Sequence, residues 1–216
     1  MTTHCDTNGA RIIGRKTLLI AATTLLMTTA ATTTFPQVAS GGDIKGTVRL
    51  QGRADCSGTV VFIDYVDSTF TPPPDSVVMD QKNLMFIPNV LPILAGTKVT
   101  FLNSDNVLHN VFTPSQCAGS FDLGTWPKGQ SRSYVFTKPD CFSLILCNVH
   151  PQMQAWIVVL QNPYFTMVNK AGSFEIRDIP AGRYVLEAWH GFYQKSSAEI
   201  VVPRGGTVVK ELRLQR

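Results

Sequence analysis

Three side chains that bind soft metal ions stand within the segment Cys147–Met153. Cys147 offers a thiolate, His150 an imidazole and Met153 a thioether. The apolar run 142–146 before them is typical of a buried strand, so the three donors belong to one loop at a strand end. Thiolate and thioether favour Cu(I), imidazole suits Cu(II), and two histidines, one cysteine and a weak axial methionine form the blue-copper arrangement. The segment therefore predicts a copper loop that needs one more histidine.

The second histidine is His109, where a polar turn, 103–106, ends and an apolar strand begins. Binding residues are often gathered on loops and element ends that a rigid scaffold holds in place. The chain has four histidines. His4 lies in a segment that we expect to be removed, and we interpret His190, with no donor cluster near it, as a structural or surface residue. The predicted ligands of a single type 1 copper are His109, Cys147, His150 and Met153.

Each ligand residue also fits an ordinary structural role. A free cysteine is often buried as a small hydrophobic side chain, and methionine fills irregular gaps in cores. The fixed spacing of Cys147, His150 and Met153, the strand before them and the additional His109 favour copper binding over coincidence.

The composition predicts an all-β protein. A chain of 216 residues allows one large or two small domains, and 44% hydrophobic residues are enough for a packed core. Sixteen glycines, thirteen prolines and many Val, Thr and Phe residues favour turns and strands over helices.

Residues 1–40 have the pattern of a secretory signal peptide. Basic residues precede a short, Thr-rich apolar stretch, 18–27, and small residues precede Gly41. We expect cleavage there, a periplasmic or otherwise exported protein, and no stable membrane insertion after cleavage. An uncleaved N-terminal anchor is the alternative.

The charge balance of the remaining chain argues against a nucleic-acid partner. Beyond residue 40 there are 16 basic and 14 acidic residues, whereas nucleic-acid binding calls for a clustered basic face. Four cysteines remain, Cys56, Cys117, Cys141 and Cys147. An oxidising compartment would permit a disulfide among them.

From residue 43 onward, short apolar runs alternate with turns. They predict strands at 44–50, 59–63, 85–88, 98–101, 131–136, 141–147 and 155–160, with a turn at 95–96. Consecutive prolines at 72–74 lack the N–H donors of a sheet ladder and mark a domain boundary.

The spacing of the cysteines predicts one disulfide. Alternation places Cys147 on the same strand face as Cys141, and His109 on the same face as Cys117. In an antiparallel pair, the residue numbers of facing residues add up to a nearly constant value. The pairs 109/147 and 117/141 have nearly the same sum, so Cys117 would face Cys141 if His109 faces Cys147. We predict a Cys117–Cys141 bridge at the end remote from the ligands. Two reduced core cysteines, with Cys56 as a third candidate partner, are the alternative.

Residues 78–160 resemble a cupredoxin, the copper-binding β-sandwich family of plastocyanin and amicyanin. The motifs at 86–88, 95–97, 103–105 and 109–111 and the C-x-x-H-x-x-M loop occur in the family's order, and the loop spacing is most similar to that of amicyanin. The resemblance implies a Greek-key β-sandwich in which Asn110, after the first histidine, helps to hold the thiolate by hydrogen bonding.

Residues 167–186 resemble a carboxypeptidase regulatory-like, transthyretin-type β-sandwich. A turn glycine precedes an aromatic strand, and Pro-x-Gly precedes the next strand. Domains of this type begin with two further strands, and residues 44–50 and 59–63 have the sequence pattern expected of these strands.

The two resemblances together predict the domain organisation. The cupredoxin domain, 76–161, is inserted into a second, smaller sandwich that consists of residues 41–75 and 162–216. The alternative is a tandem arrangement in which the first strands belong to the cupredoxin.

The ligand set predicts electron transfer and not catalysis. Two imidazoles and a thiolate in one plane below a distant thioether need little geometric change between Cu(I) and Cu(II). No coordination position stays open if Met153 binds, and no Ser-His-Asp set or carboxylate pair stands out elsewhere. We expect a periplasmic carrier of single electrons that docks weakly to a redox protein such as a cytochrome or a dehydrogenase. The docking edge would be His150, ringed by Val107, Leu108, Pro151 and Gln152.

Two other functions stay open. One is copper delivery or storage, which Met- or His-rich tracts would favour; none is evident. The other is a structural module with a vestigial copper site, against which the intact set of four ligands weighs.

Overall fold

The computed structural model describes residues 41–216, and the predicted signal peptide, residues 1–40, lies outside the described residues. The described part contains sixteen strands and one 3-10 helix, η1 (Gln116–Ala118). The predicted all-β class, with two β-sandwiches, is confirmed. Among the described residues, no helix has both the length and the apolar character needed to cross a membrane.

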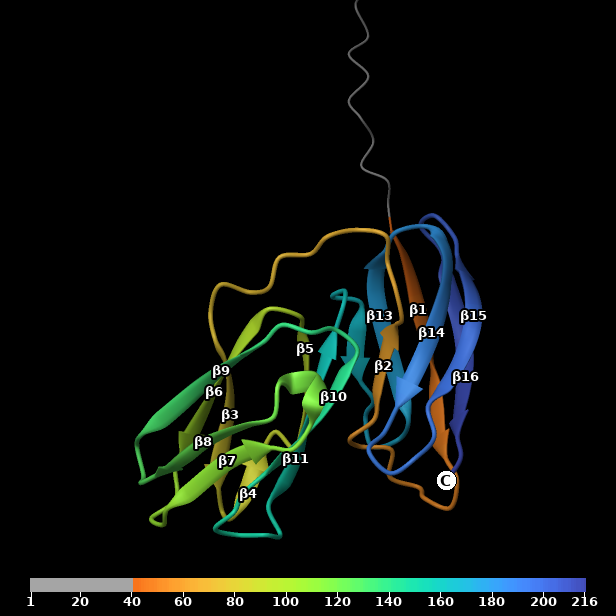
Figure 1. Cartoon of the computed structure of the whole chain (residues 1–216). Coiled ribbons are helices and arrows are strands. Elements are labelled where there is room, and N and C mark those ends of the chain that lie inside the picture. The colour runs from red at the N-terminus through yellow and green to blue at the C-terminus, as the bar shows by residue number, and fades with distance from the viewer. Residues whose placement is uncertain (1–40) are drawn as a thin grey trace, which may run out of the picture. The chain divides into compact units, whose positions relative to one another are not determined.

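The first sandwich consists of two sheets (Figure 1). The four-stranded sheet has the order β4 (Met85–Ile87), β3 (Val77–Lys82), β6 (Thr97–Asn103) and β9 (Ser131–Phe136). The five-stranded sheet has the order β5 (Val90–Leu94), β11 (Gln154–Leu160), β10 (Cys141–Leu146), β7 (His109–Thr113) and β8 (Phe121–Trp126).

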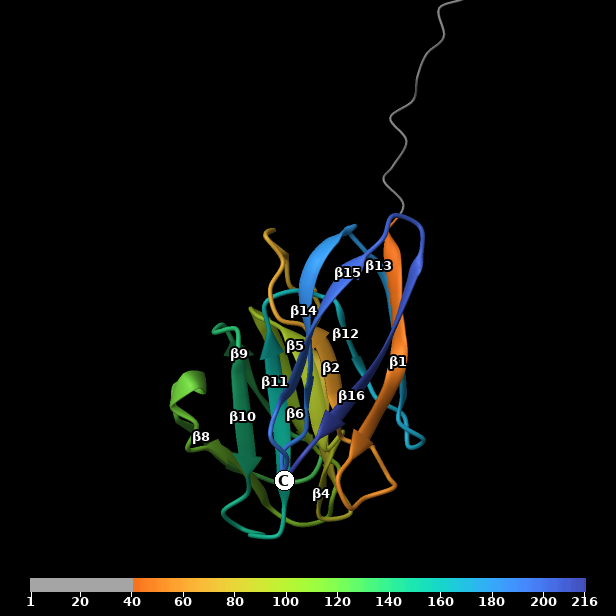
Figure 2. The ribbon, with the colours of Figure 1, turned by 90° about the vertical axis from the view of Figure 1, so that its right-hand side faces the viewer.

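The second sandwich combines strands from both ends of the described chain, as Figure 2 shows. Its three-stranded sheet has the order β13 (Ser173–Ile179), β1 (Gly42–Leu50) and β16 (Thr207–Leu214). Its four-stranded sheet has the order β12 (Phe165–Met167), β2 (Val60–Ile63), β14 (Gly182–Trp189) and β15 (Ser196–Val202). β1 and β2 therefore pair with strands that follow the first sandwich in the sequence.

Apolar side chains fill three layers between the four sheets. One cluster joins the two sheets of the first sandwich and includes Phe101 and Ile157. Another joins the two sheets of the second sandwich and includes Ile44 and Leu186. The third lies between the sandwiches, where Val158 of β11 meets residues of β2 and β14. β2 and the C-terminal half of β11 are thus buried on both faces, which explains why their sequences are continuous apolar runs.

Aromatic rings dominate the layer between the sandwiches. Phe142 of the first sandwich lies with its ring centroid 5.1 Å from that of Trp189 and 6.2 Å from that of Phe62. Trp156 meets Trp189 edge-on at 5.2 Å. Gly191 lies against Trp156, because a Cβ at this glycine would come 2.5 Å from the indole nitrogen. The five-stranded sheet of the first sandwich therefore has an apolar cover on both faces.

Several strands escaped the sequence analysis, and β5 and β8 of the first sandwich show why. β5 contains Pro92, which has no N–H to donate, and β5 lies at the edge of its sheet, paired only with β11. β8 carries Gly124, which weakens the apolar pattern by which strands are found. The predicted turn at 95–96 is present between β5 and β6.

Candidate metal centre

The pairing of β7 with β10 brings His109 and Cys147 to the same edge of the five-stranded sheet. His109 is the first residue of β7, and Cys147 follows the last residue of β10. The strands are antiparallel, with Phe112 opposite Leu146, so the start of one strand lies beside the end of the other. His150 lies in the loop that leads from β10 to β11.

The donor atoms of His109, Cys147 and His150 converge. They lie within 4.8 Å of one another, and the two Nδ1 atoms of the histidines are 3.1 Å apart. Two imidazole nitrogens bound to one ion at about 2.0–2.1 Å would be separated by about 3.1–3.5 Å. His109 and Cys147 are 0% and 3% exposed, and His150 is half-buried. Position and donor chemistry therefore fit a copper ion, with His150 on the solvent side.

Asn110 holds the Cys147 end of the loop in two ways. Its backbone N–H donates to the Cys147 sulfur at 3.4 Å, which stabilises negative charge on a thiolate. Its side-chain oxygen accepts the N–H of Asn148 at 3.1 Å, and its amide nitrogen donates to Asp122 and to the carbonyl of Gly124. The contact to sulfur is made by the backbone, so the side chain acts on the loop instead.

Asp105 is a residue of the site that the sequence analysis missed. Its carboxylate lies 2.9 Å from Nε2 of His109 and accepts the backbone N–H groups of Asn83 and Leu84. Burial raises the pKa of this carboxyl, but the hydrogen bonds from Leu84, His109 and Asn83 outweigh burial, so the pKa of Asp105 lies below its usual value. The only sequence signal was an acidic residue four positions before a candidate ligand, in a polar turn.

Met153 occupies the buried end of the loop. Its side chain is 1% exposed and belongs to the same apolar cluster as Cys147. Its backbone N–H donates to the carbonyl of His150 at 2.9 Å, which closes the turn between these two residues. The axial role of Met153 stays a prediction.

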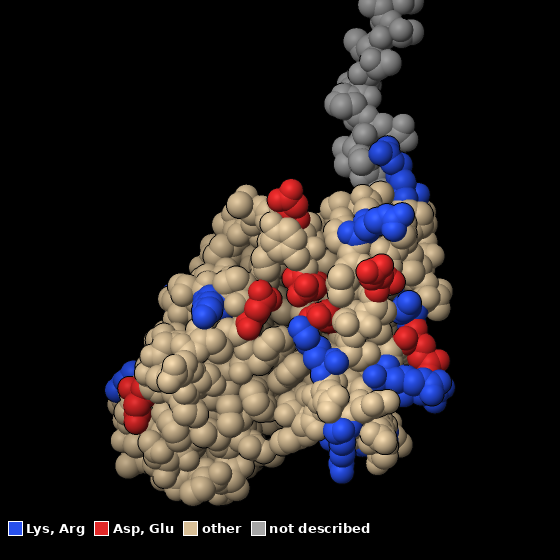
Figure 3. Space-filling view, turned by 45° about the vertical axis from the view of Figure 1, so that its right-hand side comes forward, with Lys and Arg blue, Asp and Glu red and all other residues tan. Residues whose placement is uncertain are grey.

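The rim around His150 is apolar and open to solvent. Val107, Leu108 and Val149 are 44%, 52% and 42% exposed, and Pro151 and Gln152 are exposed too. On the face drawn in Figure 3, charged side chains are sparse on the first sandwich, at the lower left, and frequent on the second sandwich. The half-buried imidazole therefore lies within a surface suited to transient apolar contact.

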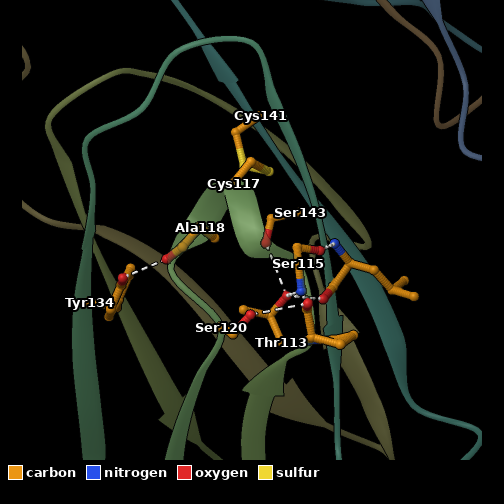
Figure 4. Close-up of a disulfide and its surroundings, with 10 residues drawn as sticks. Thr113, Ser115, Cys117, Ala118, Ser120, Tyr134, Cys141 and Ser143 are labelled. Carbon is orange, nitrogen blue, oxygen red and sulfur yellow. Dashed lines mark hydrogen bonds between the residues drawn. A yellow bond between two sulfur atoms is a disulfide. The ribbon is translucent and has the colours of Figure 1, made fainter.

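A disulfide joins Cys117 to Cys141 (Figure 4). Cys117 belongs to η1, which follows β7, and Cys141 begins β10, so the bridge connects the ends of these strands that are remote from His109 and Cys147. Beside it, the Thr113 hydroxyl donates to the carbonyl of Leu144 at 2.6 Å. The frame of the two ligand-bearing strands is thus fixed at its far end.

His190 lies in the second sandwich, away from this group. It is 5% exposed, its Nδ1 accepts the N–H of Phe192, and burial, followed by the charge of Arg53, lowers its pKa. Within residues 41–216, His109, Cys147 and His150 are the only set of three or more His, Cys, Asp or Glu residues with converging donor atoms.

No protein-family model and no curated protein sequence matches this chain. Among solved structures, a reduced tryptophan-to-tyrosine variant of amicyanin aligns at 24% identity over 46% of this chain and 97% of that chain, with a TM-score of 0.38. An oxidised methionine-to-lysine variant of amicyanin aligns at 24% identity over 39% of this chain and 81% of that chain, with a TM-score of 0.37. The copper-containing nitrite reductase of Thermus scotoductus aligns at 25% identity over 46% of this chain and 25% of that chain, with a TM-score of 0.39. Because all three TM-scores are below 0.5, the interpretation of the site rests on its own geometry.

Proposed function

We propose that the first sandwich is a type 1 copper domain that carries single electrons between redox partners. The ligands would be His109 and His150 through Nδ1, Cys147 through its thiolate and Met153 through its thioether. The observation that carries the proposal is the convergence of two imidazoles on one buried cysteine sulfur that already accepts a backbone N–H. When bound, copper supplies the Cu(I)/Cu(II) couple.

The protein frame favours electron transfer because the donor positions are fixed by the fold. His109 and Cys147 lie on paired strands, and Asn110 ties the start of the Cys147 loop to the first of these strands. A rigid frame keeps the ligand geometry similar in both oxidation states, so little reorganisation accompanies the transfer. With Met153 as a fourth donor, no position is left for a substrate, which favours a carrier over an enzyme.

The partner would be a redox protein, such as a cytochrome or a dehydrogenase, that docks on the apolar rim around His150. Weak redox encounters bury little surface, and Val107, Leu108 and Val149 offer a small apolar area beside an imidazole that reaches solvent. Because this sandwich carries few charges, association should depend only weakly on salt.

We place the protein in an exported, oxidising compartment, in line with the signal-like pattern of residues 1–40. The Cys117–Cys141 disulfide supports this proposal, since disulfides persist in oxidising compartments and are rare in reducing ones.

We also propose that residues 76–161 form a domain inserted between residues 41–75 and 162–216. The pairing of β1 with β13 and β16, and of β2 with β12 and β14, supports an insertion over a tandem arrangement. The transthyretin-type character of the second sandwich stays part of this proposal.

The test is a Cu(II) titration followed by visible spectroscopy and a reversible redox titration. We expect one equivalent of copper and an intense charge-transfer band from the Cys147 thiolate. Cys147→Ser should abolish the band, whereas Cys56→Ser, which changes the other free cysteine of the described chain, should retain it. A band that survives in Cys147→Ser would disprove the assignment. Binding of more than one copper, or its loss during a redox cycle, would favour delivery or storage.

A further inference from the structure

The contact between Asp105 and His109 carries a further inference, which rests on the proposed copper site. We infer that Asp105 is a positioning residue whose carboxylate fixes His109 as the Nε2–H tautomer, presents Nδ1 to the metal and lowers the reduction potential of the site.

The tautomer follows from the hydrogen-bonding capacity of the two groups. Both carboxylate oxygens of Asp105 already accept backbone N–H groups, so Asp105 acts as an acceptor and the Nε2 atom of His109, 2.9 Å from Oδ2, is the donor. In this tautomer Nδ1 keeps its lone pair, and Nδ1 is the atom that faces His150 at 3.1 Å. His109 is fully buried, so water does not compete for its Nε2–H, whereas the Asp105 side chain is 15% exposed.

The carboxylate is itself held in place from the turn between β3 and β4. Asn83 N–H donates to Oδ1 at 2.7 Å, and Leu84 N–H donates to Oδ2 at 2.9 Å. The N–H of Asp105 donates to the side chain of Asn103 at 2.9 Å. With both oxygens and the backbone engaged, Asp105 has one orientation available, which fixes the plane of the His109 ring in turn.

The charge of Asp105 determines the direction of the effect on the potential. When one ring nitrogen of an imidazole binds a metal, a carboxylate that accepts the N–H of the other ring nitrogen makes the imidazole a more basic ligand. A more basic ligand with a negative charge behind it stabilises Cu(II) more than Cu(I). The potential is therefore lower than it would be with a neutral acceptor at the same position.

The alternative is a purely structural role, in which Asp105 only binds the backbone N–H groups of Asn83 and Leu84 and so stabilises the turn between β3 and β4. Asp105→Asn tests the charge, since the amide has nearly the same shape and keeps one of the two acceptor oxygens but carries no charge. Asp75→Asn is the matched control, because it removes the same charge from an exposed position in the linker between the sandwiches.

Two measurements test the inference. In metal-free wild-type protein at mildly alkaline pH, nitrogen-15 NMR of the His109 ring should show the proton on Nε2. In the copper-loaded proteins, Asp105→Asn should raise the reduction potential and weaken Cu(II) binding roughly 10- to 100-fold, with a smaller loss for Cu(I), whereas Asp75→Asn should match the wild type.

The outcomes distinguish this inference from the proposed function. A proton on Nδ1 of His109 in the metal-free protein overturns the inference without reference to copper. A blue wild-type protein whose potential is unchanged by Asp105→Asn overturns the inference alone. A wild-type protein that binds no copper overturns the proposed function together with the potential effect.

Discussion

The two sandwiches differ in how many charged side chains they carry. Residues 76–161, which form the first sandwich, contain nine charged side chains, whereas residues 41–75 and 162–216 contain 21. The second sandwich pairs its charges on the solvent face of its three-stranded sheet, where Lys45 and Arg177 both contact Glu175. The polar side chains that the first sandwich buries include Asn103 and Asn110, close to the ligands.

This difference indicates a division of roles. Exposed ion pairs contribute little stability, so the ion pairs at Glu175 should contribute little to the stability of the second sandwich. Buried polar groups are costly unless they are hydrogen-bonded, and the buried side chains of Asn103 and Asn110 bond to the segments before His109 and after Cys147. Single substitutions in each part of the molecule test whether stability and metal chemistry depend on different residues.

The largest effect on stability is expected in the layer that joins the sandwiches. Trp189→Ala removes a ring that contacts both Phe142 and Trp156, and should lower the free energy of unfolding by about 3–5 kcal/mol. Phe192→Ala, an aromatic residue that is 63% exposed in the adjacent loop, should change it by less than about 0.5 kcal/mol. Chemical denaturation measures both. If Trp189→Ala lowers the free energy of unfolding no more than Phe192→Ala does, the layer does not couple the sandwiches.

Loss of the disulfide should have the next largest effect. The bridge spans 24 residues, and the double variant Cys117→Ala, Cys141→Ala should lower the free energy of unfolding by about 3 kcal/mol. Cys56→Ala is the matched control for a cysteine outside the bridge. Because the bridge lies at the far end of β7 and β10, the visible spectrum of the copper-loaded variant should not change. A lost or shifted band would mean that the bridge shapes the metal site.

Met153→Leu should change the stability of the protein only slightly but should clearly change the reduction potential of the copper site. The two side chains have similar volumes, so the stability loss should stay below about 1.5 kcal/mol. Loss of an axial donor destabilises Cu(II) more than Cu(I), so the reduction potential should rise while copper and colour are retained. Protein-film voltammetry measures the potential. If it is unchanged, Met153 is not a ligand.

The smallest effect is expected at the charged face of the second sandwich. Hydrogen bonds from Arg177 and Lys45 lower the pKa of Glu175 to about 2 from a reference value of 4.5. A lowered folded-state pKa stabilises the protein above the reference value, and this contribution is lost as the pH falls towards 2. Glu175→Gln should therefore lower the melting temperature slightly at pH 7 and not at pH 2. A difference that persists at pH 2 would exclude the ion pairs as its cause.

Much of the fold was predictable because strand alternation survives in the folded protein. Cys141, Ser143 and Ile145 point into the core together with Cys147, as their parity predicts. The antiparallel pairing of the two ligand-bearing strands also agrees with the position sums. These features depend on local periodicity, which the sequence displays directly.

The missed features depend on contacts between distant segments. The layer between the sandwiches joins β2 and β14 to β11, and each of these strands alone has only the pattern of a buried strand. The role of Asp105 depends on the N–H groups of the turn at Asn83 and Leu84, more than 20 positions away in the sequence. The one local signal, an acidic residue four positions before His109, does not show that the carboxylate meets the imidazole instead of solvent.

Copper K-edge X-ray absorption of the Cu(II)-loaded wild-type protein tests the central claim most directly, because it reports the atoms bound to the metal. We predict one short copper–sulfur bond and two copper–nitrogen bonds, from Cys147, His109 and His150. A first shell of nitrogen and oxygen alone, without a short copper–sulfur bond, would contradict the proposed site.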